Sequence, residues 1–429
     1  MTAASAIPGS PPLAGASPLP VDGIALGDLD VWARPDPERE ALFKLLRDEA
    51  PISFHEEPVI EGFGQGPGFW SLTRYDDVFY ASRHADLFCS SRGGSNIGDI
   101  PGEMAEFLGS IINMDDPRHA RLRRLVSSGF TPKELNKLLD SVRDAARDIV
   151  DTVAPKGECD FVSEIAAELP LRIICDMAGV PQSLRHTVLE QTNIILGVGD
   201  PEYVNSFEDL VGAFMTLHQM ASELGRQRLD EPGDDITSTL MHAEVDGERL
   251  TLTEFASFFI LLVVAGNETT RTAISHGMLQ LTRNPDQQAL WAADFDTHAQ
   301  NAVEEIVRYA TPVIHFRRTA TRDTQISGHP IKEGEKVVLW FNSANRDERA
   351  FPDPFRFDIA RYPNPHAGYG GGGSHFCLGA NLARREISVM FGELFRRLPD
   401  IRITGEPEML QSSFIHGIKR MPCAFTPAP

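Results

Sequence analysis

The residues with the clearest capacity for chemistry lie in a glycine-rich segment near the C-terminus, GGGGSHFCLGANLAR, at positions 370–384. Glycines let a backbone approach a flat ligand with no side chain in between. Cys377 follows them where a helix is predicted to begin, and the free amides near Leu378 and Gly379 favour a thiolate over a thiol. A lone cysteine after a flexible loop is more often an inert buried residue. Here the Gly, His, Cys and Gly positions form one pattern, which favours an anionic sulfur ligand for iron, a ligand that promotes O–O cleavage.

A second group of candidate residues occupies the middle of a long predicted helix, where the sequence reads AGNETT from Ala265 to Thr270. A glycine such as Gly266 costs a helix interior ~1 kcal/mol relative to alanine, which indicates a close neighbour or a local distortion. Glu268 and Thr269 place a carboxylate next to a hydroxyl. The alternative for Thr269 is a hydrogen bond back to a helix carbonyl.

Several cationic residues are candidates for binding the carboxylates of a ligand. His119 and Arg123 are four residues apart and share one face of a predicted helix. Arg318 follows a predicted turn after Pro312, and His375 precedes the cysteine by two positions. Arginine is the preferred planar partner of carboxylates, although each of these residues taken singly is more often a solvated charge.

The elements that must position these residues are mostly helices. Apolar residues recur at spacings of three and four in several long segments. These segments are 38–47, 132–153, 207–229, 252–281, 299–309 and 380–398. Strand-like segments are fewer, namely 68–73 and 335–340, with 326–331 as a turn-bearing partner for the second. We therefore expect a mainly α fold with small β-sheets.

The segment 252–281 predicts the longest helix. Thr251 and Glu254 form a capping-box signature at its start, and the helical pattern stops before Asn284-Pro285. About thirty residues at a rise of 1.5 Å make a rod of roughly 45 Å, long enough to cross a whole domain.

Composition excludes several classes of protein. A net charge of -21 disfavours nucleic-acid binding, which needs clustered cations. The 5 cysteines have no paired spacing, which argues against a disulfide framework and for a reducing cytosol. The longest strongly apolar stretch, 258–265, is far shorter than the ~20 residues of a membrane span. We expect a cytoplasmic protein without a membrane span.

The chain is expected to form a single domain over residues 23–429, because no linker, repeat or low-complexity block interrupts it. Residues 1–22 are rich in Pro, Gly, Ala and Ser, which predicts a disordered tail. This tail has neither the basic residues nor the continuous apolar run of a signal peptide.

The segment around Cys377 resembles the haem-binding loop of the cytochrome P450 family, whose pattern is Phe-Gly-x-Gly-x-His-x-Cys-x-Gly. The matching positions are Gly371, Gly373, His375, Cys377 and Gly379. The family's aromatic position holds Gly370, and Tyr369 lies one residue earlier. The resemblance extends over roughly residues 25–425. It implies haem b (iron protoporphyrin IX) held between the long central helix and the cysteine loop with its following helix.

The resemblance also implies roles for the other candidates. Glu305 and Arg308, three residues apart, are by spacing alone a commonplace surface ion pair, but they match a buried structural pair of the family completed by segments 345–347 and 354–357. Thr269 would hold water near the iron, and Glu268 would feed protons inward. The implied contacts of the haem and its propionates are His119, Arg123, Gly266, Arg318, Gly371, Gly373, His375 and Gly379.

Within the family, segments 262–271, 364–366 and 414–419 are similar to those of actinobacterial lipid and isoprenoid hydroxylases. That similarity implies a monooxygenase that uses O2 to hydroxylate a methyl-branched fatty acid, an isoprenoid or a sterol side chain at a terminal methyl, the ω position. The residues expected to line an apolar pocket, with plain core packing as the alternative, are Phe107, Ile111, Leu262, Val263, Val313, Phe316, Phe414 and Ile415.

The chain has no segment that fits a fused reductase, so electrons are expected from an external ferredoxin with its NAD(P)H-dependent ferredoxin reductase. Arg121, Arg124, Arg384 and Arg385 are candidates for a basic docking patch, or are solvated helix charges. Two other functions remain open. One is a haem sensor or ligand-binding protein without turnover, against which the Glu268-Thr269 pair weighs. The other is a P450-type tailoring enzyme of secondary metabolism.

Overall fold

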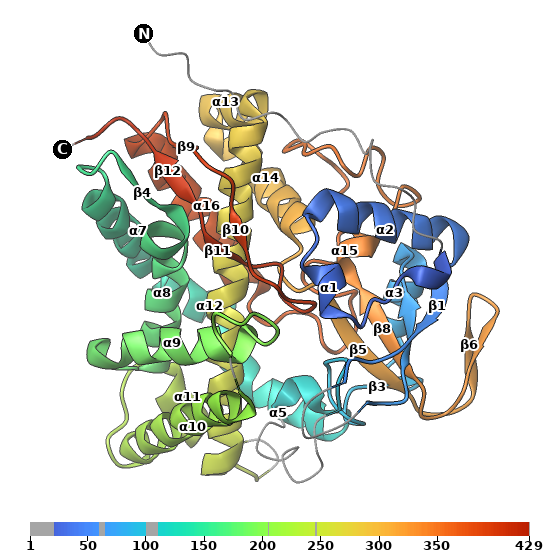
Figure 1. Cartoon of the computed structure of the whole chain (residues 1–429). Helices are drawn as coiled ribbons and strands as arrows, with labels where there is room; N and C mark the ends of the chain where they lie inside the picture. Colours follow the sequence, from blue (N-terminus) through green and yellow to red (C-terminus); the bar gives the residue numbers. More distant parts are fainter. Residues whose placement is uncertain (1–20, 60–64, 100–109, 205, 245–246, 429) are drawn as a thin grey trace.

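The computed structural model describes residues 21–59, 65–99, 110–204, 206–244 and 247–428, and helices dominate it (Figure 1). The α-helices are α1 (Leu29–Trp32), α2 (Asp36–Glu49), α3 (Tyr75–Arg83), α5 (Arg118–Ser127), α6 (Pro132–Lys137), α7 (Leu139–Val153), α8 (Glu168–Ala178), α9 (Arg185–Leu196), α10 (Phe207–Asp230), α11 (Ile236–His242), α12 (Leu252–Arg283), α13 (Pro285–Ala293), α14 (Phe295–Ala310), α15 (Phe341–Ala344) and α16 (Ala380–Arg397). The mainly α fold with small sheets is confirmed.

The strands are short and form four small sheets in the described part of the chain. They are β1 (Ile52–His55), β2 (Phe69–Leu72), β3 (Phe88–Cys89), β4 (Glu158–Asp160), β5 (His315–Ala320), β6 (Thr324–Ile326), β7 (His329–Ile331), β8 (Lys336–Trp340), β9 (Arg402–Ile403), β10 (Glu408–Met409), β11 (Ile418–Arg420) and β12 (Pro422–Ala424). The largest sheet has the order β1-β2-β8-β5-β3 and lies with α1 to α3 on one side of the molecule, while most long helices gather on the other (Figure 1).

Strand β8 is the centre of the largest sheet, and its partners differ from the expected ones. It pairs with β2 in parallel and with β5 antiparallel. Segment 326–331 does not pair with β8, because its two halves, β6 and β7, pair with each other as a hairpin around Ser327-Gly328. All side chains of β8 are buried, as expected for the apolar run 337–340 covered on both faces, and the buried Lys336 at its start pairs with Glu57 at 2.7 Å.

The helices predicted from periodicity are all present, and one of them is divided. Segment 132–153 forms two helices, α6 and α7, separated at Leu138.

The described cysteines are all free thiols. The expected tail at 1–22 lies almost wholly outside the described residues, and Val21–Gly23 at its end form a 3₁₀ turn.

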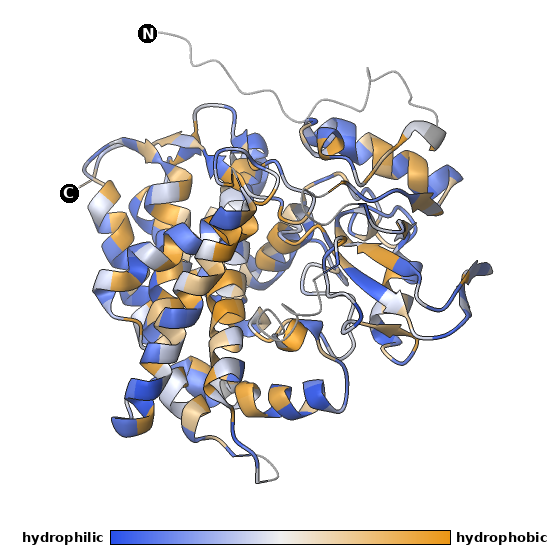
Figure 2. Ribbon diagram, turned by 60° about the horizontal axis from the view of Figure 1, so that its bottom comes forward, coloured by the Kyte–Doolittle hydropathy of each residue, from blue (hydrophilic) through white to orange (hydrophobic). Residues whose placement is uncertain are grey.

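Helix α12 is the central element of the fold. Its capping box forms as predicted, since Thr251 Oγ1 accepts from Glu254 N at 3.1 Å and the Glu254 carboxylate accepts from Thr251 N at 3.0 Å. Helices α8, α9, α10, α14 and α16 pack around it. By length and composition alone α12 could cross a membrane, but these neighbours make it the core of a helical assembly. Figure 2 shows hydrophobic faces turned toward α12 and polar residues on the outside of the surrounding helices.

A buried ion pair on α14 fixes the long segment that leads to Cys377. Arg308 and Glu305 are both fully buried, with Nε and Oε2 2.7 Å apart. Arg308 also donates to the carbonyls of Asn345 and Pro354, each at 2.8 Å. The carboxylate of Glu305 in turn accepts from Arg361 at 3.1 Å. The structure therefore contains the buried pair implied by resemblance and adds Arg361, which the sequence analysis missed.

Candidate active site

Cys377 lies at the end of the glycine-rich loop, directly before α16. Its backbone N–H donates to Tyr369 O at 3.0 Å, and this bond closes the loop on itself. Gly370 turns the chain with a φ of 93°, a conformation that a residue with a Cβ rarely adopts. The aromatic residue that takes part in the loop is therefore Tyr369, and its ring lies beneath the guanidinium of Arg384 at 4.3 Å.

Two of the loop glycines serve packing against α3. A Cβ on Gly373 would lie 2.5 Å from Ser82 O, and one on Gly371 would lie 2.8 Å from Ser82 Cβ. Neither residue lines the cavity that adjoins Cys377. Gly379 differs, because it lines that cavity and a Cβ there would meet nothing within 4 Å. Contact between Gly379 and a bound ligand stays a prediction, and the structure offers no support for it at Gly371 and Gly373.

The Cys377 side chain is exposed and lines the cavity, while many protein atoms lie around its sulfur. Burial raises its pKa, while the backbone amides of Gly379 and Ala380 and the guanidinium of Arg123 lower it without cancelling that effect. The protein alone therefore favours the thiol, contrary to the expectation from the helix N-terminus. Metal coordination deprotonates a thiol outright, so the thiolate form depends on a bound metal.

An apolar cavity of about 1340 Å³, partly open to solvent, adjoins Cys377. That volume includes the open mouth of the cavity, and the wall is predominantly apolar, as in sites that bind small organic ligands. Of the expected pocket residues, Ile111, Leu262, Val313 and Phe316 line it. The lining also includes Phe258, Leu261, Ile174 and Phe341, which the sequence analysis did not single out.

Three expected pocket residues lie outside the cavity wall. Val263 follows Leu262 on α12, and a step of one residue turns the side chain by ~100°, away from the cavity and into the core. Phe414 lies one layer behind, with its ring 5.7 Å from that of Phe316. Ile415 is buried beside it. Phe107 lies outside the described residues.

One face of α12 forms a wall of the cavity. Ala265, Gly266 and Thr269 lie on this face. The Thr269 hydroxyl donates to Ala265 O at 2.8 Å, so it can accept a hydrogen bond from the cavity while that bond persists. Packing explains why glycine occupies position 266, because a Cβ added there would lie 2.9 Å from Ile174 Cδ1 on α8.

Glu268 does not face the cavity. Its buried carboxylate forms an ion pair with Arg271 and accepts from Thr272 Oγ1 at 3.4 Å. Arg271 in turn donates to Asn193 Oδ1 at 3.0 Å. The structure thus separates Glu268 from Thr269, because neighbours on a helix point ~100° apart. A proton path from Glu268 to the cavity stays a prediction that requires this ion pair to open.

A buried carboxyl group that the sequence analysis missed lines the cavity. Glu386 on α16 is buried, and burial raises its pKa to about 8, against a smaller lowering by a hydrogen bond with Thr270. It lies nine positions after Cys377, which carries no recognisable spacing signal. Glu386 and its hydroxyl partner Thr270, the residue after Thr269, both line the cavity. They therefore form an acid–hydroxyl pair on the cavity wall.

Three of the four cationic candidates line one end of the cavity, and Arg318 does not line it but lies close enough to lower the pKa of His375. The rings of His119 and His375 lie 4.3 Å apart, and both residues line the cavity with Arg123. The pKa of His375 is lowered to about 3 by burial and by Arg318, His119 and Arg123. Burial lowers the pKa of Arg318 to about 10, and no carboxylate of the described residues lies within ion-pair distance of it.

This cluster fits an anionic ligand. Nε2 of His119 is buried without a hydrogen-bond partner in the described structure, and the guanidinium of Arg318 donates to a neighbouring carbonyl, Arg317 O, at 2.8 Å. Buried donors and charges without partners are costly, so a group with carboxylates at this end of the cavity would satisfy them. A haem has two propionates, and these residues together with Cys377 fit a haem. The fold and the site thus define a haem-thiolate protein.

The comparisons with known proteins agree with this class. The cytochrome P450 family model matches residues 72–400, and the chain belongs to the cytochrome P450 family of monooxygenases. It is 51% identical over 426 residues to the methyl-branched lipid omega-hydroxylase of Mycobacterium tuberculosis, covering 99% of this chain and 98% of that protein. It is 42% identical to the steroid C26-monooxygenase of Rhodococcus jostii, over 94% of this chain and 85% of that protein.

A solved structure shows the same fold. The chain matches Mycobacterium marinum cytochrome P450 CYP268A2 in complex with pseudoionone with a TM-score of 0.89 and 46% identity, covering 96% of this chain and 100% of that one.

Proposed function

We propose that this P450 monooxygenase binds haem b through the Cys377 thiolate and hydroxylates an apolar methyl-branched lipid at a terminal methyl. The observation that carries the proposal is one cavity, because the Cys377 loop and the Thr269 face of α12 line the same apolar space. Haem supplies the activation of O2 and the oxidation, and the protein supplies binding, orientation and control of protons.

Different residues of the chain bind the haem, orient the substrate and hold water. His119, Arg123, Arg318 and His375 hold the propionates as donors and cations. The apolar wall with Leu262, Val313 and Phe316 excludes water and orients the substrate. The Thr269 hydroxyl holds a water molecule in the cavity as an acceptor.

The lipid class rests on two supports. Two similar proteins are named for methyl-branched lipids and for steroid C26, and the cavity wall of this chain is predominantly apolar. A terminal methyl has a stronger C–H bond than an internal methylene. Regioselectivity therefore requires that the chain end reaches the reactive centre first, which is a matter of orientation.

An external ferredoxin with its reductase would supply the electrons in the cytoplasm. Of the four arginines considered for docking, Arg121 pairs with Glu254 and Arg384 pairs with Glu304, so their charges are partly compensated. Arg124 is exposed on α5 and Arg385 lies on α16. All four arginines are kept as candidates for contact with an acidic partner.

The proposal is tested by reconstitution. The haem-loaded enzyme, a surrogate ferredoxin, its reductase and NADPH are incubated with a methyl-branched lipid, and the hydroxylated carbon is mapped. We expect the terminal alcohol as the main product. Exclusive in-chain hydroxylation would contradict the ω assignment, and substrate binding without any product would favour a ligand-binding protein.

A further inference from the structure

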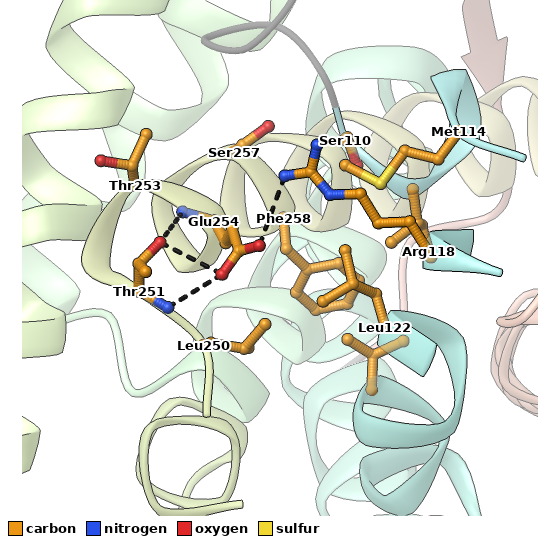
Figure 3. Close-up of a pocket in the computed structure, with 12 residues that line it drawn as sticks. Ser110, Met114, Arg118, Leu122, Leu250, Thr251, Thr253, Glu254, Ser257 and Phe258 are labelled. Carbon is orange, nitrogen blue, oxygen red and sulfur yellow. Dashed lines mark hydrogen bonds and ion pairs between the residues drawn. The ribbon is translucent and has the colours of Figure 1, made fainter. Parts of the chain in front are cut away.

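The two ends of α12 are surrounded differently. Its N-terminal end borders a polar pocket of about 570 Å³, partly open to solvent, where Glu254 pairs with Arg118 at 3.3 Å (Figure 3). Its C-terminal end contacts the small sheet of β4, β12 and β9, where Ile403 N donates to Thr282 Oγ1 at 3.1 Å. This sheet carries two thiol groups that line neither the polar pocket nor the cavity at Cys377.

Strands β4 and β12 hold these thiols opposite each other. Cys159 on β4 pairs directly with Cys423 on β12 in an antiparallel register. Phe161 N donates to Met421 O at 2.8 Å beside the pair, and β9 pairs with the other edge of β12, so the position of β12 is fixed from both sides. Opposite residues of antiparallel strands have Cα atoms about 4.5–5.5 Å apart, which is within the range that a disulfide requires.

The two sulfur atoms are already in contact. Both cysteines are free thiols, and Sγ of Cys159 lies 3.4 Å from Sγ of Cys423. Cys423 is buried, whereas Cys159 is partly exposed. A bond of ~2.0 Å between the sulfurs therefore requires only a small rotation of the two side chains.

A disulfide fits this pair better than a metal ion does. Structural zinc sites use four Cys or His ligands. No group of three or more His, Cys, Asp or Glu side chains suited to a metal occurs in the described part of the chain. The positive charge of Lys156 near Cys159 also disfavours a second cation there.

The surroundings of Cys159 favour the neutral thiol. The hydrogen bond with Cys423 and burial raise the pKa of Cys159, and the nearby Lys156 lowers it without cancelling that effect. The thiolate is the reactive form, so the pair is expected to react slowly and to stay reduced until an oxidant accumulates.

We propose that Cys159 and Cys423 form a reversible disulfide when the protein meets hydrogen peroxide. The sulfur of Cys159, the more exposed thiol, bonds to one peroxide oxygen, the O–O bond breaks, and one water molecule leaves a sulfenic acid behind. The Cys423 sulfur then bonds to Cys159 Sγ, the S–O bond breaks, and a second water leaves. The two thiols lose two electrons and two protons, and one peroxide becomes two water molecules.

The bond would join the two ends of a long segment. The cysteines are 264 positions apart, and the segment between them contains α8, α12 and Cys377. Such a crosslink stabilises a fold mainly by restricting the unfolded chain, and the effect increases with loop length. It also keeps β12, the last strand of the described structure, in its sheet. The oxidised protein is therefore expected to resist heat better, without a change at the cavity, which neither Cys159 nor Cys423 lines.

The test treats the haem-loaded enzyme with hydrogen peroxide and then blocks the remaining thiols with iodoacetamide in denaturant. Tryptic peptides are analysed by mass spectrometry with and without dithiothreitol, and the peptides expected to be joined are 157–172 and 421–429. The variants are Cys159→Ser and Cys423→Ser. Cys175→Ser is the matched control, because Cys175 is a buried cysteine on α8, outside this sheet.

In the wild type and in Cys175→Ser, peroxide is expected to join the two peptides, and dithiothreitol is expected to separate them. The midpoint of thermal unfolding is expected to rise by about 2–5 °C on oxidation and to fall back after reduction. The Soret band of the reduced carbonyl complex is expected to keep its position. Neither the joined peptides nor the higher midpoint is expected in Cys159→Ser or Cys423→Ser. Cys423→Ala is a second variant at the buried position that adds no polar group to the core.

Two results would overturn the proposal. One is a wild type in which peroxide leaves both cysteines as thiols, or oxidises them separately, with no joined peptides. The other is an equal rise of the unfolding midpoint in wild type and Cys159→Ser, which would assign the effect to another site. Neither measurement involves turnover, so both are independent of the proposed ω-hydroxylation.

Discussion

At the scale of single residues, the site depends on groups whose protonation is set by their surroundings. The Cys377 thiol is kept neutral by burial although two backbone amides and Arg123 act in the opposite direction. In the cationic cluster around His375 and Arg318, burial lowers the pKa of both residues, and Nε2 of His119 is buried without a hydrogen-bond partner in the described structure. A haem bound as proposed would stabilise both, with Cys377 as the metal ligand and the cationic residues as partners of its carboxylates.

The first prediction concerns Cys377. Cys377→Ser is expected to abolish the red-shifted Soret band of the reduced carbonyl complex, because that band requires sulfur on the iron. The measurement is the absorption spectrum of reduced enzyme under carbon monoxide. Cys175→Ser, a buried cysteine on α8, is the control and is expected to keep the band. A wild-type band without the red shift would rule out thiolate ligation.

The second prediction concerns Glu386. Its pKa is about 8 in the folded chain, above the ordinary value of 4.5, so the folded state holds this proton more strongly than the unfolded state does. The stability linked to this proton is complete below pH ~4.5 and is lost as pH rises toward ~8. Glutamine does not titrate, so the Glu386→Gln variant does not lose this stability as pH rises. The difference in unfolding free energy, variant minus wild type, is expected to rise by at least about 1 kcal/mol from pH 5 to pH 8.

Denaturant unfolding at both pH values provides this measurement. Glu393→Gln is the control, because Glu393 lies on the same helix and pairs with Arg396 at the surface. An equal pH dependence in wild type and Glu386→Gln would show that the carboxyl is ionised in the folded chain.

At the scale of elements, α12 combines a structural and a functional face. The face that carries Ala265 and Thr269 lines the cavity, while Glu268 and Val263 belong to other faces and serve ion pairing and packing. Gly266 lies where α8 approaches α12 closely. The AGNETT pattern is therefore divided between helix packing and the cavity.

A third prediction tests the role of Gly266. Gly266→Ala gains ~1 kcal/mol of helix propensity but overpacks against Ile174 Cδ1, which costs about 1–3 kcal/mol. We expect a net destabilisation of up to about 2 kcal/mol in denaturant unfolding. In an Ile174→Val background, which removes Cδ1, the same substitution is expected to stabilise the protein. Equal effects in both backgrounds would contradict this packing explanation.

A fourth prediction concerns α14. Glu305→Gln leaves Arg308 and Arg361 buried without their carboxylate, and breaking such a pair costs about 3–5 kcal/mol. The unfolding free energy is expected to fall by that amount, and haem retention with it, since this network fixes the segment before Cys377. Glu38→Gln, which breaks a surface pair with Arg34, is the control and is expected to change stability by less than about 0.5 kcal/mol. A small effect of Glu305→Gln on the unfolding free energy would show that this network does not stabilise the protein.

At the scale of the whole molecule, charge and shape set its partners. The net charge of -21 repels acidic proteins at long range, so docking of an acidic ferredoxin needs a local cationic surface. The fold places α5 and α16, which carry the four candidate arginines, next to the Cys377 loop, because Arg123 on α5 donates to Phe376 O and α16 begins at Ala380. Electrons would then enter on the side of the sulfur ligand.

The fifth prediction follows from this arrangement. Turnover with ferredoxin is expected to fall steeply as ionic strength rises, because screening weakens charge-steered association. Calorimetric binding of the substrate is the control and is expected to change little with salt. Turnover that is insensitive to salt would contradict docking through a cationic surface.

The sequence by itself determined the features that depend on local pattern. The helices, the capping box of α12 and the Cys377 loop follow from periodicity, cap chemistry and a motif in which every residue is close in the chain. The tertiary structure alone decided which side chains face one another. Leu262 lines the cavity while Val263 does not, Glu268 turns to Arg271, and Glu386 and Arg361 join sites far away in sequence. The reason is physical, because propensities and caps act over a few residues, whereas burial and pairing depend on how whole helices pack.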